Sequence, residues 1–432
     1  MTKILKFSNK LFSAKLNKFI NKDRQKSTNI TEKVRKIILD VKNNGDKALA
    51  KYTKRFDENN IEDFKVSDAE MNDALKSCDN ELARSLKIAA KRIGEFHKLQ
   101  MPSDFNYKDK DEVYLGVKWD PLDSVGLYVP GGKASYPSSV LMTAVPAKIA
   151  GVKNISMCVP APKGILNTSV LLAAKISGVK NIYKIGGAQA IAALTFGTES
   201  ISSVNKIFGP GNSWVAEAKR QVFGKVGIDM LAGPSEIMVL ADNKNNSKWI
   251  AADLLSQAEH DVAAQSILIT DDLAFANNVE RDINKLLNIL PRSDISKVSW
   301  NENGLILVVK ELKDSIDIIN LVAPEHLELA VDGSEKYIKK IKNAGAIFMG
   351  RYVPEAIGDY IAGPNHVLPT SRTARFSSGL STMDYMTRTS LVKCSKKSLK
   401  NISSAAIKIA ESEGLYAHAL SMSIRTNGSK NE

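Results

Sequence analysis

Apolar and polar positions follow two different periods along the chain. Over residues 31–57 and 68–99, apolar side chains recur three and four positions apart, a spacing that predicts amphipathic helices. After Trp119 alanine-rich helical stretches alternate with short runs rich in β-branched residues, which are 124–129, 154–159, 181–185 and 206–208. Short strands that alternate with helices indicate βαβ units and a mostly parallel sheet.

An internal repeat supports this interpretation. Residues 147–155 read AKIAGVKNI and residues 174–182 read AKISGVKNI, so eight of nine positions are identical at a spacing of 27 residues. Each copy is interpreted as the last turn of a helix, a glycine at a left-handed C-cap and the start of a strand. We therefore expect two tandem βα units.

A second series of the same kind follows. Runs typical of strands are 236–241, 266–270, 305–309 and 346–349, with helical periodicity at 248–260 and 274–290. Both series end at corners rich in glycine and proline, where open parallel sheets bind their ligands. From residue 372 onward the pattern is helical and polar, which predicts a small helical appendage. The expected fold class is α/β.

Composition excludes several classes of protein. Hydrophobic residues make up 44% and charged residues 25%, as in ordinary globular domains. No apolar run approaches the roughly 18 residues of a membrane-spanning helix, so we expect no membrane partner. The net charge of +13 is spread along the chain with acids between, and the 6% of aromatics do not alternate with the basic residues. We therefore expect solvated faces and no nucleic-acid partner.

Two features bear on localisation. The first 26 residues hold eight basic side chains and one acid, Asp23, which favours a basic helical arm; a mitochondrial-type presequence is the alternative. The three cysteines, Cys78, Cys158 and Cys394, form no CxxC pair, which favours a reducing compartment. The expected localisation is cytoplasmic.

Histidines are the candidates for chemistry. His97 lies in a charged helical stretch and is expected to face solvent, whereas the other four follow residue 259, beside acids or glycines. They are His260, His326, His366 and His418. For any one of them, a hydrogen-bonded structural histidine is the alternative interpretation.

Each of these histidines has polar neighbours of a chemically useful kind. Gln257 and His260 are spaced i and i+3 on a predicted helix face and could bind a metal or an imidazole-sized ligand, although an HExxH pair is absent. Glu325 beside His326 is typical of a general acid–base pair, with a surface glutamate and a strand-capping histidine as the alternative. The glycine-punctuated loop 358–366 could present Asp359 and His366 inward, and the final helical stretch holds Glu413 and His418.

Two glycine corners are candidates for a phosphate-bearing ligand. Residues 186–189 read GGAQ and residues 209–212 read GPGN, each after a predicted strand. Backbone N–H groups at such a corner can bind phosphate at a helix N-terminus. The GxGxxG fingerprint is absent, and a strand–glycine–helix corner is by itself generic.

Taken together, these segments resemble the histidinol dehydrogenase family, from about residue 34 through residue 425. The matching stretches are GLYVPGG (126–132), YPSSVLM (136–142), GGAQAIAAL (186–194), IFGPGN (207–212), AGPSEI (232–237), DLLSQAEHD (253–261), APEHLEL (323–329), GDYIAGPNHVLPT (358–370) and EGLYAHA (413–419). Lys133 and the surroundings of Met383 look like local variation, and no functional position departs from the family pattern.

The resemblance implies a fold and a domain division. The fold would have two incomplete Rossmann-like parallel-sheet domains with small N- and C-terminal helical appendages. The implied parts are an arm at 1–25, a domain of 26–126 plus 235–379 with most of the zinc and catalytic site, an NAD-binding domain at 127–234, and a helical domain at 380–432 that completes the partner's active site.

The resemblance also implies roles for individual residues. The zinc ligands would be Gln257, His260, Asp359 and His418, the last supplied across a domain-swapped homodimer. Glu325 and His326 would be the catalytic acid–base pair, and Tyr128, Gln189 and Asn212 would bind NAD. The substrate contacts would be Ser235, His366 and Glu413 together with His326 and the zinc ligands.

The implied reaction is oxidation of L-histidinol to L-histidine by two NAD through the aldehyde, with one zinc ion per subunit. Since no cysteine is near a candidate base, Glu325 is expected to activate water for an aldehyde hydrate, and His326 to take the alcohol proton. A carboxylate at Glu413 would complement the substrate's ammonium group. The alternatives are a zinc/NAD dehydrogenase of another small alcohol, such as a sulfonated diol, and a catalytically silent metal- or nucleic-acid-binding protein.

Overall fold

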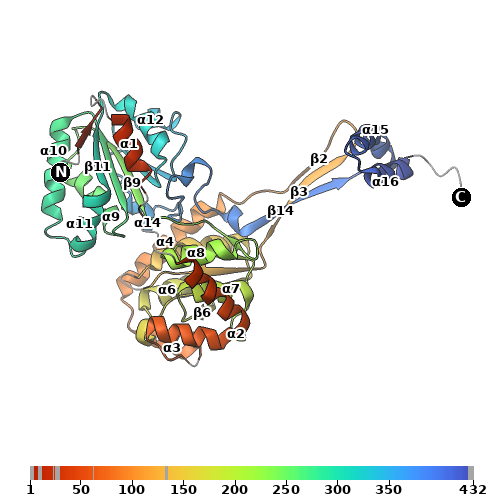
Figure 1. Ribbon diagram of the computed structural model, residues 1–432, viewed down its shortest axis with the longest axis horizontal. Helices are drawn as coiled ribbons and strands as arrows, with labels where there is room; N and C mark the ends of the chain where they lie inside the picture. The colour runs from red at the N-terminus through yellow and green to blue at the C-terminus, as the bar shows by residue number, and fades with distance from the viewer. Residues whose placement is uncertain are drawn as a thin grey trace.

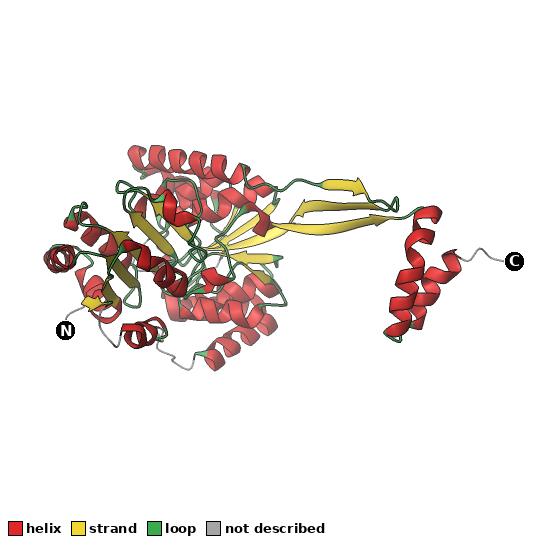
Figure 2. Cartoon of the chain, turned by 90° about the horizontal axis from the view of Figure 1, so that it is seen from above, coloured by secondary structure: helices red, strands yellow, loops and turns green. Residues whose placement is uncertain are grey.

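The chain is organised around two parallel sheets and one antiparallel sheet (Figure 1). The structure, a computed structural model, describes residues 4–7, 12–22, 24, 30–61, 63–131 and 135–426. The parallel sheets, each with its helices, form two bodies that lie side by side, and a long arm carries the C-terminal helices away from them (Figures 1 and 2). The expected α/β class with two parallel-sheet domains is confirmed, as are helices at both ends of the chain. Gly132 and Lys133 lie outside the described residues, as do Asp23 and part of the basic arm.

The first parallel sheet has five strands in the order β6-β5-β4-β7-β8. These are β4 (Ser124–Tyr128), β5 (Asn154–Cys158), β6 (Asn181–Tyr183), β7 (Lys206–Phe208) and β8 (Gly227–Ile228). The intervening helices are α5 (Pro137–Ala150), α6 (Thr168–Ser177), α7 (Gly187–Phe196) and α8 (Ser213–Val222). Gly151 and Gly178 end α5 and α6 in the left-handed region, at φ of 94° and 80°. The repeat is therefore two βα units, as expected.

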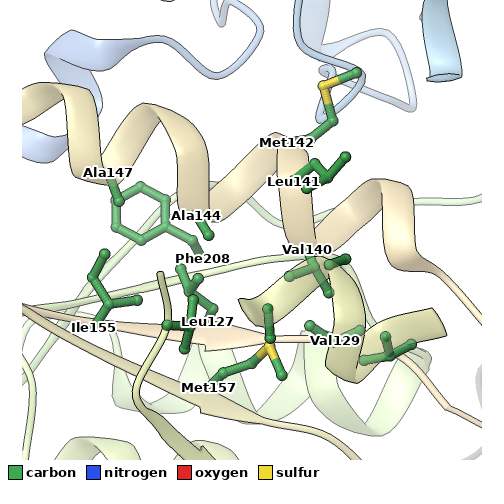
Figure 3. Close-up of a cluster of buried hydrophobic side chains, with 14 of the residues drawn as sticks. Leu127, Val129, Val140, Leu141, Met142, Ala144, Ala147, Ile155, Met157 and Phe208 are labelled. Carbon is green, nitrogen blue, oxygen red and sulfur yellow. The ribbon is translucent and has the colours of Figure 1, made fainter. Parts of the chain in front are cut away.

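Helices from the N-terminal part of the chain complete the core of this sheet. They are α2 (Thr31–Asp57), α3 (Asp68–Lys76) and α4 (Asn80–Lys98). In one core, α5 lies across the strands with Val140, Ala144 and Ala147 near Leu127 and Phe208 (Figure 3). α2 packs against α7 and α8, and α4 packs against α5. The structure thus joins these helices to the five-stranded sheet, whereas the expected division grouped 26–126 with 235–379.

The second parallel sheet has six strands in the order β1-β11-β10-β9-β12-β13. They are β1 (Ile4–Lys6), β9 (Glu236–Ala241), β10 (Gln265–Thr270), β11 (Gly304–Val308), β12 (His326–Ala330) and β13 (Ala346–Met349). Its helices are α1 (Phe12–Ile20), α9 (Ser247–Ala258), α10 (Leu273–Leu286), α11 (Ser293–Asn303), α12 (Ser315–Val322), α13 (Glu335–Ile338) and α14 (Ala356–Tyr360). Every residue of β9, β10 and β12 is buried, as is typical of parallel strands covered on both faces.

The N-terminal arm is part of this second sheet. β1 pairs in parallel with β11, and Phe12 and Leu16 of α1 are buried in the core on one face. Arg24 pairs with the buried Glu236 at the start of β9. The described part of the arm therefore contributes a strand and core side chains, which the basic pattern alone did not indicate.

The antiparallel sheet forms the arm that projects from the two bodies. It contains β2 (Phe105–Lys108), β3 (Tyr114–Pro121) and β14 (Met386–Lys393), in the order β14-β3-β2. At its end lie α15 (Lys396–Ser412) and α16 (Tyr416–Thr426), which pack against each other. The helical prediction from residue 372 onward is wrong at β14, because an eight-residue register with β3 determines its conformation and no local periodicity signals that partner.

Two local expectations are corrected. Asp79 caps the N-terminus of α4 by accepting from the N–H groups of Glu81 and Leu82, so the helical stretch 68–99 is two helices. His97, expected to face solvent, is fully buried: its ring bonds to the Ile93 carbonyl and to the Asn365 amide. Among the described residues, none of the helices is long and apolar enough to cross a membrane.

Candidate active site

Glu325 and His326 lie at the amino end of β12, where the backbone of Glu236 holds both. The Glu236 N–H donates to Glu325 Oε2 at 2.8 Å, and His326 Nδ1 lies 2.9 Å from the Glu236 carbonyl oxygen. Because a carbonyl only accepts, Nδ1 carries the proton and Nε2 is unprotonated in the neutral ring. Nε2 has no hydrogen-bond partner among the described residues. The expected pair is therefore brought together with a free basic nitrogen.

The carboxyl group of Glu236 is itself held by the rest of the chain. It pairs with Arg24 and accepts from the Ser371 N–H at 3.2 Å. Ser235, an expected substrate contact, comes directly before it, and its carbonyl accepts from the Gln265 N–H at 2.9 Å. The amino ends of β9 and β10 are thus fixed behind the acid–base pair.

The unprotonated nitrogen of His326 faces the carboxyl groups of two acidic side chains. Nε2 lies 3.5 Å from Glu355 Oε1 and 3.9 Å from Asp359 Oδ1. Burial lowers the pKa of His326, and the charge of Asp359 opposes that shift. His326 is therefore neutral near pH 7 and able to accept a proton.

Several buried acids share this region. Burial raises the pKa of Glu325 well above its usual value, and the charges of Glu236, Asp359 and Glu355 act in the same direction. Burial likewise raises the pKa of Glu355 to about 9 and that of Asp253 to about 6. The ionised form of Glu325 is consequently a stronger base than a solvated carboxylate.

Asp359 and His366 meet as the loop pattern predicted. Asp359 lies on the short helix α14, and His366 Nδ1 donates to its backbone carbonyl at 3.0 Å. On the other side of the ring, Ser139 Oγ donates to His366 Nε2 at 3.3 Å. Ser139 belongs to α5, so this bond joins the site to the five-stranded sheet.

Gln257 and His260 lie at the C-terminal end of α9, but they do not share a helix face. The helix ends at Ala258, and His260 follows in a turn closed by its N–H to the Gln257 carbonyl at 3.2 Å. Gln257 is buried, and its Oε1 lacks a partner among the described residues. Charge on His260 acts to lower the pKa of His326 and that of His366, so His260 lies within electrostatic range of both.

These groups fit a divalent cation. The donor atoms of His326, Glu355 and Asp359 lie within 4.8 Å of one another, and the buried Oε1 atoms of Gln257 and Glu355 lack partners. Neutral nitrogen and oxygen donors are ligands that zinc accepts. Glu355 is missing from the expected set. Its spacing of four residues from Asp359 is a signal that could have identified it.

Glu413 and His418 are not part of this cluster within one chain. Glu413 ends α15 and His418 lies on α16, and both side chains are exposed. The arm carries both helices far from α14 (Figure 1). The contribution expected from these two residues therefore requires another copy of the chain.

The three residues expected to bind NAD surround the glycine corners of the five-stranded sheet. Tyr128 ends β4, and its hydroxyl accepts from the Gly187 N–H at 3.0 Å. Gln189, on the first turn of α7, is buried with Oε1 unpartnered among the described residues. Asn212 is the N-cap of α8 and accepts from two N–H groups of its first turn.

These corners also form a close backbone cradle. A Cβ added at Gly186 would lie 2.4 Å from Pro160, and one at Gly209 would lie 2.1 Å from the Tyr128 carbonyl oxygen. Gly209 has φ of 108°, a conformation that side chains disfavour. Glycines at two neighbouring helix N-termini and an unpartnered buried amide fit a phosphate-bearing ligand.

Comparison with known proteins gives one consistent result. Residues 20–426 match the sequence model of the family described as histidinol dehydrogenase. The chain is 53% identical to the histidinol dehydrogenase of Gluconobacter oxydans, with 92% of this chain and 93% of that protein covered. It is 54% identical to that of Rhodospirillum rubrum, with 94% of each covered.

A solved structure agrees with the sequence comparison. The crystal structure of histidinol dehydrogenase from Elizabethkingia anophelis superposes with a TM-score of 0.94 at 38% identity, covering 98% of both chains. The fold, the site and the sequence lead to the same conclusion. The chain belongs to the histidinol dehydrogenase family, whose members are oxidoreductases of histidine biosynthesis.

Proposed function

We propose that this protein oxidises L-histidinol to L-histidine through the aldehyde, with two NAD as oxidants. Family membership supports the substrate, and the observation that carries the chemistry is the unprotonated Nε2 of His326, which lies beside Glu325. The buried Oε1 atoms of Gln257 and Glu355 are also without hydrogen-bond partners among the described residues. The balanced reaction consumes one water and releases two NADH and three protons.

His326 is the base of the alcohol step in this proposal. Its Nδ1–H is held by the Glu236 carbonyl, so Nε2 receives the hydroxyl proton as the hydride leaves the carbon. NAD, bound by Tyr128, Gln189 and Asn212, supplies the hydride acceptor for both oxidations. His326 takes the hydroxyl proton again when the aldehyde hydrate is oxidised.

Glu325 forms that hydrate by activating water. Its Oε2 is fixed by the Glu236 N–H, which leaves Oε1 to take a proton as water adds to the aldehyde carbon. A covalent thiohemiacetal would require a cysteine at the site. Cys158 is buried within β5, Cys78 lies between α3 and α4, and Cys394 is exposed beyond β14, so none belongs to the cluster.

The metal proposed for this site is one zinc ion per subunit. Gln257, His260 and Asp359 would hold it together with His418 of the partner subunit. Zinc held there would orient the substrate by its imidazole and amine nitrogens. Ser235, His366 and the partner subunit's Glu413 are the proposed substrate contacts beside His326 and the zinc ligands.

Sharing of sites in a domain-swapped homodimer is supported by the arm. α15 and α16 expose apolar side chains at its end, far from either core (Figure 2). They include Ile409, Leu415, Tyr416, Leu420 and Ile424. Apolar faces of this kind are typical of protein interfaces.

Dimers that combine two different variants test directly whether the subunits share their active sites. Glu325→Gln alters the part of the active site at β12, and His418→Asn alters the part that α16 contributes to the partner. A dimer of either variant alone therefore has two defective sites. In a mixed dimer one site combines the intact halves, and random mixing restores about a quarter of wild-type activity. No recovery after unfolding and refolding the two variants together would contradict the swap. Two copies of the same variant, mixed in the same way, are the control.

The runner-up substrate is another small alcohol such as a sulfonated diol. A carboxylate at Glu413 favours the ammonium group of histidinol over a sulfonate, which would prefer lysine or arginine. Zinc-loaded protein is assayed with each alcohol and NAD, and the acid product is identified by mass spectrometry. L-histidine formation supports the proposal; turnover of the sulfonated diol alone would establish the alternative.

A further inference from the structure

A buried ion pair lies beneath the corner that joins β7 to α8. Lys219, on α8, and Asp229, just beyond β8, are 3% and 1% exposed at their side chains, and they contact each other directly. Neither residue belongs to the proposed catalytic, metal or substrate groups. Both side chains also hydrogen-bond to the backbone of Gly209.

Both backbone groups of Gly209 are held by this pair. The Gly209 N–H donates to Asp229 Oδ2 at 2.7 Å, and Lys219 Nζ donates to the Gly209 carbonyl at 3.0 Å. The Met230 N–H donates to the other oxygen of Asp229 at 2.6 Å. The two peptide groups that flank Gly209 are therefore each held by a charge-assisted hydrogen bond, which is stronger than a neutral one.

The position of Gly209 explains why it must be held. Its φ of 108° and its contact with the Tyr128 carbonyl allow no side chain, so side-chain packing cannot fix the corner. The corner leads in three residues to Asn212, the N-cap of α8. The backbone held at Gly209 thus determines how Asn212 is placed relative to Tyr128, two residues of the proposed NAD site.

A contribution to the free energy of unfolding does not by itself explain why a buried ion pair is present here. Desolvating two charges costs several kcal/mol, and apolar replacements of similar volume are often at least as stable. A charged pair instead fixes geometry, since its hydrogen bonds have defined directions.

We propose that Lys219 and Asp229 are positioning residues that hold the corner 209–212 in the conformation that receives NAD. The inference rests on the proposed function for the identity of the dinucleotide. Neither side chain touches NAD in this account; both act through the backbone of Gly209.

The test is a double variant, Lys219→Met with Asp229→Asn, which removes both charges and nearly keeps the volumes. We expect the KM for NAD and the Kd for NADH to rise roughly 10- to 100-fold, the range seen when outer-sphere partners are removed from other sites. The KM for histidinol and the zinc content should stay within about twofold of wild type, because their proposed residues lie around the six-stranded sheet and on the partner's arm, away from Gly209. NADH binding is measured by calorimetry and fold by thermal unfolding.

A matched control removes a second, less deeply buried ion pair, Arg351→Met with Asp242→Asn, at the carboxyl end of β9. It should leave NAD binding unchanged. A folded Lys219/Asp229 double variant with wild-type NADH affinity would overturn the positioning role, as would an equal loss in the control. Wild-type protein that binds no NADH would overturn the proposed function as well. If the double variant does not fold, Asp229→Asn alone serves, with a smaller rise in the same constants expected and an unchanged NADH affinity as the contradiction.

Discussion

In the two parallel sheets the candidate functional residues lie at opposite ends of the strands. In the five-stranded sheet the candidate residues follow the strands: Tyr128 ends β4, Gly187 begins the helix after β6, and Gly209 follows β7. In the six-stranded sheet Glu236 begins β9 and His326 begins β12, and Asp359 comes to the same edge from α14, which follows β13. One α/β architecture therefore supplies two kinds of edge.

The chemical groups at the two edges differ, and each set suits a different kind of ligand. The carboxyl edge of the five-stranded sheet offers glycine corners and helix N-termini, whose partial positive charge suits the phosphates of a dinucleotide. The amino edge of the six-stranded sheet offers buried carboxylates, imidazoles and the C-terminal end of α9, which suit a metal cation and a cationic substrate. The bond from Ser139 to His366 joins the two edges.

The largest effect is expected at the cation-binding edge. His260→Asn removes one proposed zinc ligand, so we expect metal and activity to be lost together. The loss in activity should be roughly 10³-fold, since a substrate that the metal no longer orients loses several kcal/mol of the barrier reduction. Metal content and turnover are measured on the same sample, and full activity without bound zinc would refute the ligand assignment.

Glu325→Gln separates the two oxidations at the same edge. The amide cannot take a proton from water, so oxidation of supplied histidinaldehyde should fall by roughly 10²- to 10⁴-fold. Alcohol oxidation depends on His326 and should fall less. Equal losses for both substrates would show that Glu325 is not the water activator.

Ser139→Ala weakens the junction between the edges. It removes one hydrogen bond to His366, and we expect kcat/KM for histidinol to fall roughly 3- to 10-fold. NADH affinity should be unchanged, because the glycine corners are not touched. An altered NADH affinity would mean that the two edges are not independent.

The smallest expected effect is on the pH dependence of the free energy of unfolding, through His97 and its neighbour Asn365 between the two sheets. His97 Nε2 accepts from the Asn365 amide at 3.3 Å, and that amide also donates to the Met142 carbonyl at 2.6 Å. Burial lowers the pKa of His97 in the folded protein, opposed by its bond to the Ile93 carbonyl. Below the unfolded pKa of about 6.5 the unfolded chain gains a proton that the folded chain does not, so stability falls as pH falls toward the folded pKa.

His97→Gln should remove this contribution. The dependence of the free energy of unfolding on pH, measured by urea titration between pH 7 and pH 5, should become shallower by at most about 1.4 kcal/mol per pH unit. An unchanged slope would show that His97 takes up protons equally in the folded and unfolded protein.

Sequence patterns predicted most of the five-stranded sheet and less of the cation-binding edge. The limits of α2, β7, β9 and β13 agree with their periodicity, and the repeat identified the glycine caps of α5 and α6. Glu236 escaped prediction because its ion-pair partner Arg24 is distant in sequence, and Glu355 because the fold alone brings it to His326. β14 escaped because its partner β3 lies more than 250 residues earlier.

The most direct test of the central claim is the yield of NADH per L-histidinol consumed. Purified, zinc-loaded protein is given limiting L-histidinol and excess NAD, and NADH and histidine are both quantified. The account predicts two NADH for each histidinol, with L-histidine as product and no turnover after chelation. One NADH with release of free aldehyde would contradict the coupled oxidation, and no NADH from folded, zinc-loaded protein would contradict the proposed substrate.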